Sequence, residues 1–423
     1  MTGENQTVII LGAGQAGGQC AASLRRLGWT GRIVLAGAEP HPPYQRPPLS
    51  KAYLSGEMDE TRLWLQPPEI WAEQDVDLRL GVTATAVDRE AKTVTFDDGR
   101  TERYDRLVFA TGSQVRRLNV RGAAKTKNIR YLRTIADVDA LKADFAPGKR
   151  IVIIGGGYIG LEAASVARKL GAEPVVLEAM DRLLARVAVP ELSQFYLEAH
   201  RARGVTVELN ALVAEIVGKG GLFGGMKSLK SVKLGDDREI ECDSVLVGIG
   251  ILPCQALAAK AGLATGNGIA VDAECRTSDP NIFAIGDCAE QENWLTGTRV
   301  RLESVPNALD QAKHAAAAIC GAPPPKPEVP WFWSDQFDLK LQTAGLIGQQ
   351  DLTLQRRPAD PGEGHFSLFH LKDGVLIAAD CVNDAHGFMA AKAMIAARAK
   401  PDVDALVDPK VPMKDVMKAA LGR

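Results

Sequence analysis

Two glycine-rich turns, each set between a strand pattern and a helix pattern, constrain the fold of this chain most strongly. The internal one lies in Ile151–Glu162, where the apolar run IVII leads into Gly155-x-Gly157-x-x-Gly160 and an apolar helical pattern follows at once. In such a dinucleotide fingerprint the first glycine permits the tight turn and the second lets the backbone approach a pyrophosphate. The third lets helix and strand pack closely, so the phosphates lie at the helix N-terminus.

A second copy of the fingerprint opens the chain. The strand pattern TVIIL leads into Gly12-x-Gly14-x-x-Gly17, a helical pattern follows, and a further strand, RIVL, leads to Glu39. An acidic residue after the second strand of such a unit commonly binds a ribose hydroxyl. An isolated fingerprint is often only a turn, but strand, glycines, helix and acid in register predict nucleotide binding.

The acidic residue of the internal unit is Glu178, which follows the strand PVVL. A carboxylate at this position accepts hydrogen bonds from a ribose 2′-OH and repels a 2′-phosphate, so the sequence favours NADH over NADPH. Arg182 and Arg186 follow closely and could weaken that preference.

Two glycines mark places where the chain crosses between domains. The strand YDRLVFA ends at Ala110 and runs into Thr111 and Gly112, and this glycine lets the backbone pass close to a ligand. Gly250, after the strand SVLVGI, marks the return crossing.

The proline-rich stretch HPPYQRPPLSKAYL is stiff and non-helical, apart from a short helix that Ser50 is placed to cap. From composition alone it is either a surface loop or a rigid shelf that places Arg46 and Lys51 beside a cofactor.

Two later motifs suggest further ligand contacts. Gly286-Asp287 ends a strand, where glycine permits close contact and aspartate offers acceptors to sugar-alcohol hydroxyls. A proline-rich linker, APPPKPEVP, precedes the aromatic motif WFWSDQ at Trp331–Gln336, whose rings either form core or cover an aromatic cofactor.

Composition and charge exclude several classes of function. A chain of 423 residues with 46% hydrophobic and 24% charged residues is long enough for two or three globular domains. Its net charge of −2 gives no footprint for nucleic acid. With no apolar run of about 18 residues and no signal segment in MTGENQ, we expect a cytoplasmic protein without a membrane anchor. Seven scattered cysteines, an odd number without C-x-x-C spacing, argue against a disulfide scaffold or a zinc site.

Together these motifs resemble the two-dinucleotide flavoproteins of the glutathione-reductase fold, in which the first fingerprint holds FAD and the second a nicotinamide cofactor. The segments RPPLSKAYL, GGGYIGLE, FAIGDCA, ESVPNALDQA and PWFWSDQ resemble, over nearly the whole chain, the FAD-dependent ferredoxin reductases of bacterial oxygenase systems. The resemblance implies an α/β fold with two Rossmann-like dinucleotide-binding domains and a C-terminal α+β domain. The implied boundaries are 1–114 and 251–327 for the FAD-binding domain, 115–250 for the NAD-binding domain and 328–423 for the C-terminal domain.

The resemblance also implies roles for single residues. Lys51 would contact the flavin near N5, and Glu162, in the first turn of its helix, would face Lys51 beside the nicotinamide. These two are the candidate catalytic residues. Further implied contacts are Gly12, Gly14, Ala16 and Gly17 at the FAD pyrophosphate, Ala84 and Arg133 along FAD, Asp287 at the ribityl chain, Val305 near the flavin ring and Trp333 beside it, with Tyr158 and Ile159 added at the second fingerprint. One departure concerns Glu39, because the family places its acid one residue earlier, where this chain has Ala38.

The implied reaction takes a hydride from NADH to FAD and passes electrons singly to a [2Fe–2S] ferredoxin that serves a P450 or an aromatic-ring oxygenase. Disulfide reductases of the same fold carry a C-x4-C pair in the region where this chain has its cysteine-free proline-rich stretch. Arg299, Arg301 and Lys313 are candidate docking residues for an acidic ferredoxin. The alternatives are a rubredoxin or monodehydroascorbate-type reductase, a flavoprotein similar to apoptosis-inducing factor, and an FAD-binding module that transfers nothing.

Overall fold

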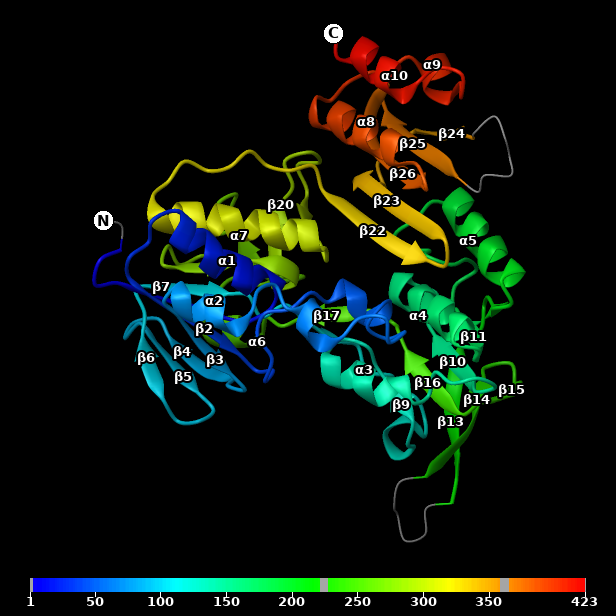
Figure 1. Ribbon diagram of the computed structural model, residues 1–423, viewed down its shortest axis with the longest axis horizontal. Coiled ribbons are helices and arrows are strands. Elements are labelled where there is room, and N and C mark those ends of the chain that lie inside the picture. The colour runs from blue at the N-terminus through cyan, green and yellow to red at the C-terminus, as the bar shows by residue number, and fades with distance from the viewer. Residues whose placement is uncertain (1–2, 221–226, 358–364, 423) are drawn as a thin grey trace. The chain divides into compact units, whose positions relative to one another are not determined.

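The computed structural model describes residues 3–220, 227–357 and 365–422, and the chain divides into two compact units (Figure 1). Unit 1 comprises Met1–Gln45, Glu60–Gln114 and Leu252–Phe332, and unit 2 comprises Arg46–Asp59, Val115–Ile251 and Trp333–Arg423. The proline-rich stretch Arg46–Asp59 therefore groups with unit 2, whereas the boundaries that the resemblance implies include it in residues 1–114.

Unit 1 is built on a parallel five-stranded sheet in the order β19-β7-β1-β2-β3. Its strands are β1 (Thr7–Leu11), β2 (Arg32–Gly37), β3 (Val76–Leu80), β7 (Arg106–Phe109) and β19 (Ile282–Ala284). Val8 and Ile10 pack on the face that α1 (Gln15–Arg26) and α7 (Val305–Cys320) cover side by side (Figure 1). Because side chains alternate along a strand, Ile9 packs on the opposite face, against Phe96 of a small antiparallel sheet.

The remaining elements of unit 1 surround this sheet. They are β4 (Ala84–Asp88), β5 (Thr93–Phe96), β6 (Thr101–Arg103), β18 (Ile269–Val271), β20 (Ala289–Glu292), β21 (Arg299–Val300), α2 (Pro68–Glu73), α6 (Ala256–Lys260), and the 3-10 turns η2 (Glu60–Leu63) and η5 (Gly286–Cys288). The predicted N-terminal order of strand, glycine turn, helix and strand is confirmed.

Unit 2 repeats the same plan with a second parallel sheet, in the order β12-β11-β10-β16-β9. Its elements are β9 (Ile129–Arg130), β10 (Arg150–Ile154), β11 (Glu173–Leu177), β12 (Thr206–Glu208), β16 (Ser244–Val247), α3 (Ile135–Lys142), α4 (Tyr158–Lys169), α5 (Pro190–Ala202), and the 3-10 turns η1 (Pro47–Ser50) and η3 (Ala123–Lys125). Val152 and Ile154 pack against an antiparallel sheet of β13 (Val213–Lys219), β14 (Ser228–Leu234) and β15 (Glu239–Glu241). The glycine-rich segment GKGGLFGGMK joins β13 to β14, and the sequence predicts a hairpin tip there rather than a phosphate loop because the strand-to-helix context of such a loop is missing. Most of it lies outside the described residues.

The C-terminal part of unit 2 is a five-stranded sheet with helices, as the sequence predicts for an α+β domain. The strand order is β22-β23-β26-β25-β24, and the pairs β23–β26, β26–β25 and β25–β24 are antiparallel. Its elements are β22 (Trp331–Gln336), β23 (Leu339–Gly345), β24 (Leu352–Arg356), β25 (Phe366–Lys372), β26 (Val375–Val382), α8 (Ala385–Ala396), α9 (Val403–Val407) and α10 (Met413–Ala420).

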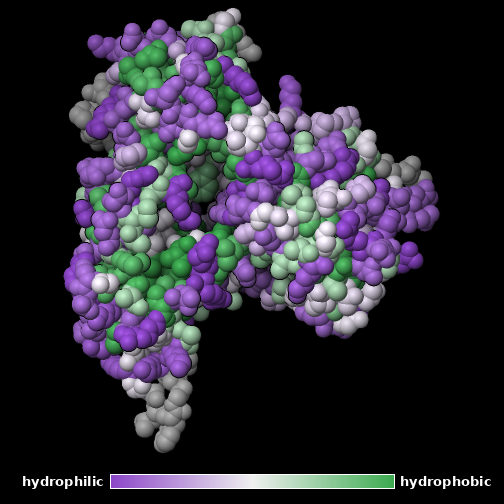
Figure 2. All heavy atoms as spheres, turned by 180° about the vertical axis from the view of Figure 1, so that it is seen from behind, coloured by the Kyte–Doolittle hydropathy of each residue, from purple (hydrophilic) through white to green (hydrophobic). Residues whose placement is uncertain are grey.

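Two short strands, β8 (Ser113–Val115) and β17 (Ile251–Pro253), pair where the chain leaves unit 1 and returns to it. They coincide with the two crossings that the sequence places at Gly112 and Gly250. None of the helices in the described part of the chain combines the length and apolar character that a membrane crossing needs. Hydrophilic and hydrophobic residues are interspersed over the face drawn in Figure 2.

Candidate functional site

The first glycine turn joins β1 to α1 and has the geometry that a pyrophosphate requires. Gly12 has a φ of +117°, and a Cβ there would collide with the carbonyl oxygen of Ala110. A Cβ on Gly17 would collide with the carbonyl oxygen of Gly12, so this glycine sets the contact between helix and strand. By contrast, a Cβ on Gly14 would meet no atom within 4 Å. The space in front of Gly14 is therefore open, at the N-terminus of α1, where a phosphate is favoured.

The second turn, between β10 and α4, repeats this geometry. Gly155 has a φ of +111°, and a Cβ on it would collide with the carbonyl oxygen of Gly248. A Cβ on Gly160 would collide with the carbonyl oxygen of Gly155, whereas a Cβ on Gly157 would meet nothing within 4 Å. Both turns thus leave open space at the second glycine, where the phosphates of a dinucleotide would lie.

This symmetry allows a crossed prediction. In Gly14→Ala and Gly157→Ala the added methyl group enters open space, so both variants are expected to fold. Gly157→Ala is expected to keep the melting temperature of the natural protein, whereas Gly14→Ala is expected to melt lower because it loses a stabilising ligand. Gly14→Ala is expected to lose bound flavin, with at least about tenfold weaker FAD retention, because the methyl occupies the position of the pyrophosphate. Gly157→Ala is expected to retain flavin and to bind NADH at least about tenfold more weakly. Flavin absorbance after gel filtration and NADH titration measure the two effects, and equal flavin loss in both variants would contradict the assignment.

The acidic residue of the second unit closes its glycine turn. Glu178 Oε2 accepts a hydrogen bond of 2.7 Å from the backbone N–H of Gly156, and Oε1 accepts one of 2.8 Å from that of Met180. Glu178 follows β11 directly, in register with Gly155. A carboxylate held in this way presents its remaining lone pairs at the edge where a ribose is expected.

The first unit departs from this arrangement. Leu11 pairs with Ala36 in the same register in which Ile154 pairs with Leu177, so the position equivalent to Glu178 is Gly37. Glu39 lies two residues further on, and its Oε2 accepts a hydrogen bond of 2.7 Å from the hydroxyl group of Tyr44. Tyr44 therefore orients the carboxylate that is expected to bind a ribose hydroxyl, a contact that no sequence pattern indicates.

The two arginines after Glu178 differ in whether their guanidinium groups could contact a ligand. Arg182 donates to the carbonyl groups of Ala185 and Ala188 and to the hydroxyl of Ser193, at 2.7–2.9 Å, and so braces its own turn. Arg186 is exposed, and its guanidinium lies beside the return crossing, 3.1 Å from the position that a Cβ on Gly250 would take. Arg186 is therefore the better placed of the two to meet a ligand.

The predicted FAD-contacting residues of unit 1 are held by a network around the first crossing. Thr111 Oγ1 donates to the carbonyl of Cys254 at 2.7 Å, and the carbonyl of Gly112 accepts from the N–H of Cys254 at 2.9 Å. Ser113 Oγ donates at 2.8 Å to Asp287 Oδ2, which orients the carboxylate proposed for the ribityl chain. Arg301 donates to the carbonyl of Asp287 at 3.1 Å.

The burial of Arg301 corrects one expectation. Its side chain is only 8% exposed and is paired with Glu303 at 2.6 Å, so it supports the Asp287 loop and does not present a charge for docking. Arg299 and Lys313 remain more exposed, each with a carboxylate about 4 Å away.

Three further expected residues of unit 1 lie in elements next to the turns. Gly286 has a φ of +74° and donates its N–H at 2.8 Å to Oε1 of Gln311, a buried α7 residue that the sequence analysis missed. Val305 is the first residue of α7, Ala84 is the first residue of β4, and both are partly buried.

In unit 2, the proline-rich stretch brings Lys51 to Glu162, as the resemblance implied. Lys51 Nζ lies 2.7 Å from Glu162 Oε2, with side chains 19% and 2% exposed. Ser50 Oγ donates to the same oxygen at 2.5 Å, and Ser334 Oγ donates to Oε1 at 2.6 Å. A buried carboxylate needs such compensation, so the pair is hydrogen-bonded and charge-balanced.

Two sequence-based expectations about this pair are wrong. Ser50 does not cap a helix: it is the last residue of η1, and its hydroxyl donates to Glu162. Glu162 does not lie in the first turn of α4, which starts at Tyr158 and has no acidic residue in that turn. It lies in the second turn, so its position owes more to Lys51 and the two serines than to the helix dipole.

The other expected residues of unit 2 flank this pair. Arg46 Nη1 donates to the carbonyl of Arg133 at 2.5 Å, which links the proline-rich stretch to the segment before α3. Tyr158 and Ile159 begin α4, with Ile159 43% exposed. Trp333 lies in β22 and is partly buried.

The cysteines form no disulfide, and all seven lie in the described residues. Burial raises the pKa of Cys20 and of Cys242 to about 12. Burial also raises the pKa of Cys275, Cys288, Cys320 and Cys381. The thiolate is the reactive form, so these six thiols are unsuited to a redox relay.

The two glycine turns, the parallel sheets behind them and the C-terminal antiparallel sheet define a glutathione-reductase-type fold with two Rossmann units and an added domain. The chain belongs to the pyridine nucleotide-disulphide oxidoreductase family, whose model matches residues 6–312, and residues 331–417 match the reductase C-terminal family.

Similar proteins cover almost the whole chain. It is 47% identical to a probable ferredoxin reductase, CtmF, of Castellaniella defragrans, over 96% of this chain and 98% of that protein. It is 39% identical to the putidaredoxin reductase CamA of Pseudomonas putida, over 98% of each. The crystal structure of a covalent putidaredoxin reductase–putidaredoxin complex contains a chain 38% identical to this one, with a TM-score of 0.95, covering 99% of this chain and 100% of that one.

Proposed function

We propose that this chain is the reductase component of an oxygenase system, taking electrons from NADH and passing them to a ferredoxin. The observation that carries the proposal is the pair of open glycine turns on one chain whose family is that of pyridine nucleotide oxidoreductases. The named ferredoxin reductases among its relatives support the ferredoxin as acceptor.

FAD on the first turn and NADH on the second fit the residues present, and FAD supplies the conversion between hydride transfer and single-electron transfer. Asp287, oriented by Ser113, offers acceptors for the hydroxyl groups of the ribityl chain. Lys51 would supply a positive charge against the negative charge of a reduced ring, and Glu162, 2.7 Å away, holds the Lys51 ammonium group in place.

The raised pKa values of six of the seven thiols support a direct exit of electrons to an external carrier, because those six are not prepared to act as a redox relay. The acceptor is then a one-electron protein, for which we propose a [2Fe–2S] ferredoxin serving a P450 or an aromatic-ring oxygenase. A rubredoxin is the second candidate, because a rubredoxin-NAD(+) reductase of Pseudomonas putida is 38% identical over 81% of this chain.

Coenzyme choice provides the first test. Because the Glu178 carboxylate would face a 2′-phosphate, the kcat/KM for NADH is expected to exceed that for NADPH by at least about tenfold. Anaerobic stopped-flow bleaching of the flavin by each coenzyme measures this preference. Glu178→Gln removes the carboxylate charge and is expected to reduce the preference for NADH over NADPH. A preference for NADPH in the unmodified protein would overturn the assignment.

Acceptor choice provides the second test. The NADH-reduced protein is mixed with a [2Fe–2S] ferredoxin, a rubredoxin or the monodehydroascorbate radical, and reoxidation is followed. Fastest reoxidation by the ferredoxin supports the proposal, whereas failure to reduce any [2Fe–2S] protein overturns it.

A further inference from the structure

Behind Glu162, a chain of buried polar side chains runs through unit 2. Ser334 Oγ, which donates to Glu162 Oε1, accepts a hydrogen bond of 3.1 Å from Gln336 Nε2. Gln336 Oε1 lies 2.8 Å from His200 Nε2. Ser334, Gln336 and His200 are all 0% exposed, so this row of hydrogen bonds is sealed from solvent.

Every link of this chain has a defined direction. The amide nitrogen of Gln336 faces Ser334, so its carbonyl oxygen faces His200, and a carbonyl can only accept. His200 must therefore donate through Nε2, which leaves Nδ1 without a proton. All the hydrogens point toward Glu162 Oε1, which accepts the last of these hydrogen bonds.

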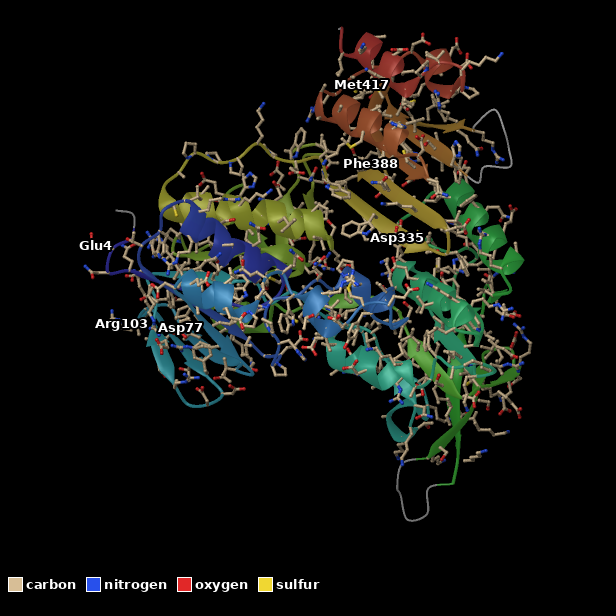
Figure 3. All side chains as sticks on the ribbon, in the orientation of Figure 1. Glu4, Asp77, Arg103, Asp335, Phe388 and Met417 are labelled. Carbon is tan, nitrogen blue, oxygen red and sulfur yellow. The ribbon has the colours of Figure 1, made fainter. Side chains whose placement is uncertain are left out.

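These hydrogen-bonded side chains come from three elements that lie far apart in the sequence. Glu162 is on α4, His200 is on α5, and the serine and glutamine are on β22 of the C-terminal sheet. Side chains alternate along β22, so Ser334 and Gln336 share one face, where both are buried, while Asp335 lies on the other. Figure 3 labels Asp335 and so locates β22 among the side chains. Just beyond the strand, the N–H of Phe337 donates to Ser165 Oγ of α4 at 2.6 Å.

Stability alone does not explain why these buried side chains are polar. His200 Nδ1 has no hydrogen-bond partner among the described residues, and well-packed apolar side chains would avoid that penalty. A buried polar chain that ends on one carboxylate oxygen is instead a means of fixing how that carboxylate is turned. With Ser334 on Oε1, the carboxylate keeps Oε2 toward Lys51 and Ser50.

We propose that Ser334, Gln336 and His200 are positioning residues, which act through Glu162 to hold the Lys51 ammonium group in place for hydride transfer. The inference rests on the proposed function for the meaning of that pair, but it makes a separate claim about three residues that would touch neither dinucleotide.

The test uses a double-mutant cycle with matched controls. Ser334→Ala is made in the natural protein and in Glu162→Gln, alongside Ser334→Thr, which keeps the hydroxyl, and Gln336→Met, which keeps the length. Ser244→Ala is the control, because Ser244 is also buried in unit 2 but its hydroxyl has no partner among the described residues. It also lies at the start of β16, the end of the parallel sheet away from the glycine turn.

In the natural background, Ser334→Ala and Gln336→Met are expected to slow flavin reduction by NADH about 3–10-fold, the size of effect that one lost hydrogen bond gives. The NADH dissociation constant is expected to change less than about twofold, since the chain positions a group and does not bind the coenzyme. Ser334→Thr and Ser244→Ala are expected to stay within about twofold of the natural rate. In the Glu162→Gln background, Ser334→Ala is expected to have no further effect, because its route of action is already removed.

Melting temperatures provide a readout that does not depend on activity. The losses caused by Ser334→Ala and Glu162→Gln are expected to be non-additive, whereas those of Ser244→Ala and Glu162→Gln should add. An unchanged reduction rate in Ser334→Ala, or additive losses in the cycle, would overturn the inference. A natural protein that NADH does not reduce would overturn the proposed function, and the thermal cycle would still decide whether Ser334 is coupled to Glu162.

Discussion

Glu162→Gln is expected to lower the melting temperature of the protein by about 6–12 °C, alongside a loss of NADH-dependent flavin reduction. The side chain keeps its size, and the hydroxyls of Ser50 and Ser334 can rotate to suit an amide. The Lys51 ammonium group, only 19% exposed, is then left without its counter-charge at 2.7 Å. Removing one member of a buried ion pair costs about 3–5 kcal/mol, and because Lys51 keeps some contact with water we expect about 3 kcal/mol.

The matched control is Glu57→Gln, which removes the charge from another lysine pair in the same unit. Glu57 and Lys169 are 57% and 56% exposed, so water replaces the lost partner and the melting temperature should barely change. Differential scanning calorimetry of the two variants gives the comparison. Equal melting temperatures for Glu162→Gln and Glu57→Gln would show that burial of the Lys51–Glu162 pair does not matter.

Replacing both partners separates stability from function. The double variant Lys51→Met, Glu162→Leu leaves no charge at this buried position, so it is expected to melt at a higher temperature than Glu162→Gln. It is nevertheless expected to remain slow in reduction by NADH, because the positive charge proposed to act there is absent. Recovery of both properties together would mean that the pair has a purely structural role.

The glycine turns could be predicted from the sequence because their geometry is local. Gly12 and Gly155 have a positive φ, and a Cβ on Gly17 or Gly160 would collide with the carbonyl oxygen of the first glycine of its own turn. The spacing of three glycines therefore contains nearly all the information. The Lys51–Glu162 pair was reached only through the family resemblance, because no local pattern relates two residues 111 positions apart.

The contacts that position Glu162 could not be read from the sequence. Ser50 and Ser334 lie 112 and 172 residues from Glu162, and a serine has the same appearance in a cap, a turn or a core. In WFWSDQ the aromatic rings suggest either core packing or a cofactor contact, whereas the buried polar positions are the alternating Ser334 and Gln336. Strand alternation within the motif was the one available signal.

Glu39 shows a different limit. Its position relative to the glycine turn depends on strand register, and a strand predicted to end at Leu35 actually continues to Gly37. The acid therefore lies two residues past the position equivalent to Glu178, and Tyr44 takes part in placing it. The sequence places an acidic residue shortly after β2, but its register relative to the glycine turn is set by pairing with β1, which no local pattern shows.

His200 is expected to make the stability of the protein fall as the pH drops below about 6.5. Burial lowers the pKa of His200 from 6.5 to about 4, and the charge of Arg203 acts in the same direction, while the hydrogen bond to Gln336 opposes it. The rings of Tyr196 and Phe337 pack against the imidazole, with centroids 6.4 and 5.1 Å away. In this setting a second ring proton would have no acceptor among the described residues.

The sign of the effect follows from proton binding. Between about pH 6.5 and pH 4 the unfolded chain protonates His200 and the folded protein does not, so unfolding takes up a proton and becomes easier as the pH falls. The stability contribution is complete above about pH 6.5 and has decreased by about 2 kcal/mol at pH 5. His200→Gln keeps a donor for Gln336 but cannot be protonated, so its stability relative to the natural protein should rise by this amount between pH 7.5 and pH 5.

Melting curves of the natural protein, His200→Gln and a surface control, His386→Gln, measured at both pH values, test the prediction. For a unit of this size, about 2 kcal/mol corresponds to a relative shift of about 4–8 °C. If the difference in melting temperature between His200→Gln and the natural protein is the same at pH 7.5 and pH 5, His200 binds protons equally in the folded and unfolded states, and burial does not lower its pKa. A ring that takes up its second proton near pH 6.5 would still donate through Nε2 to Gln336, but its Nδ1–H would then need an acceptor that the described residues do not provide.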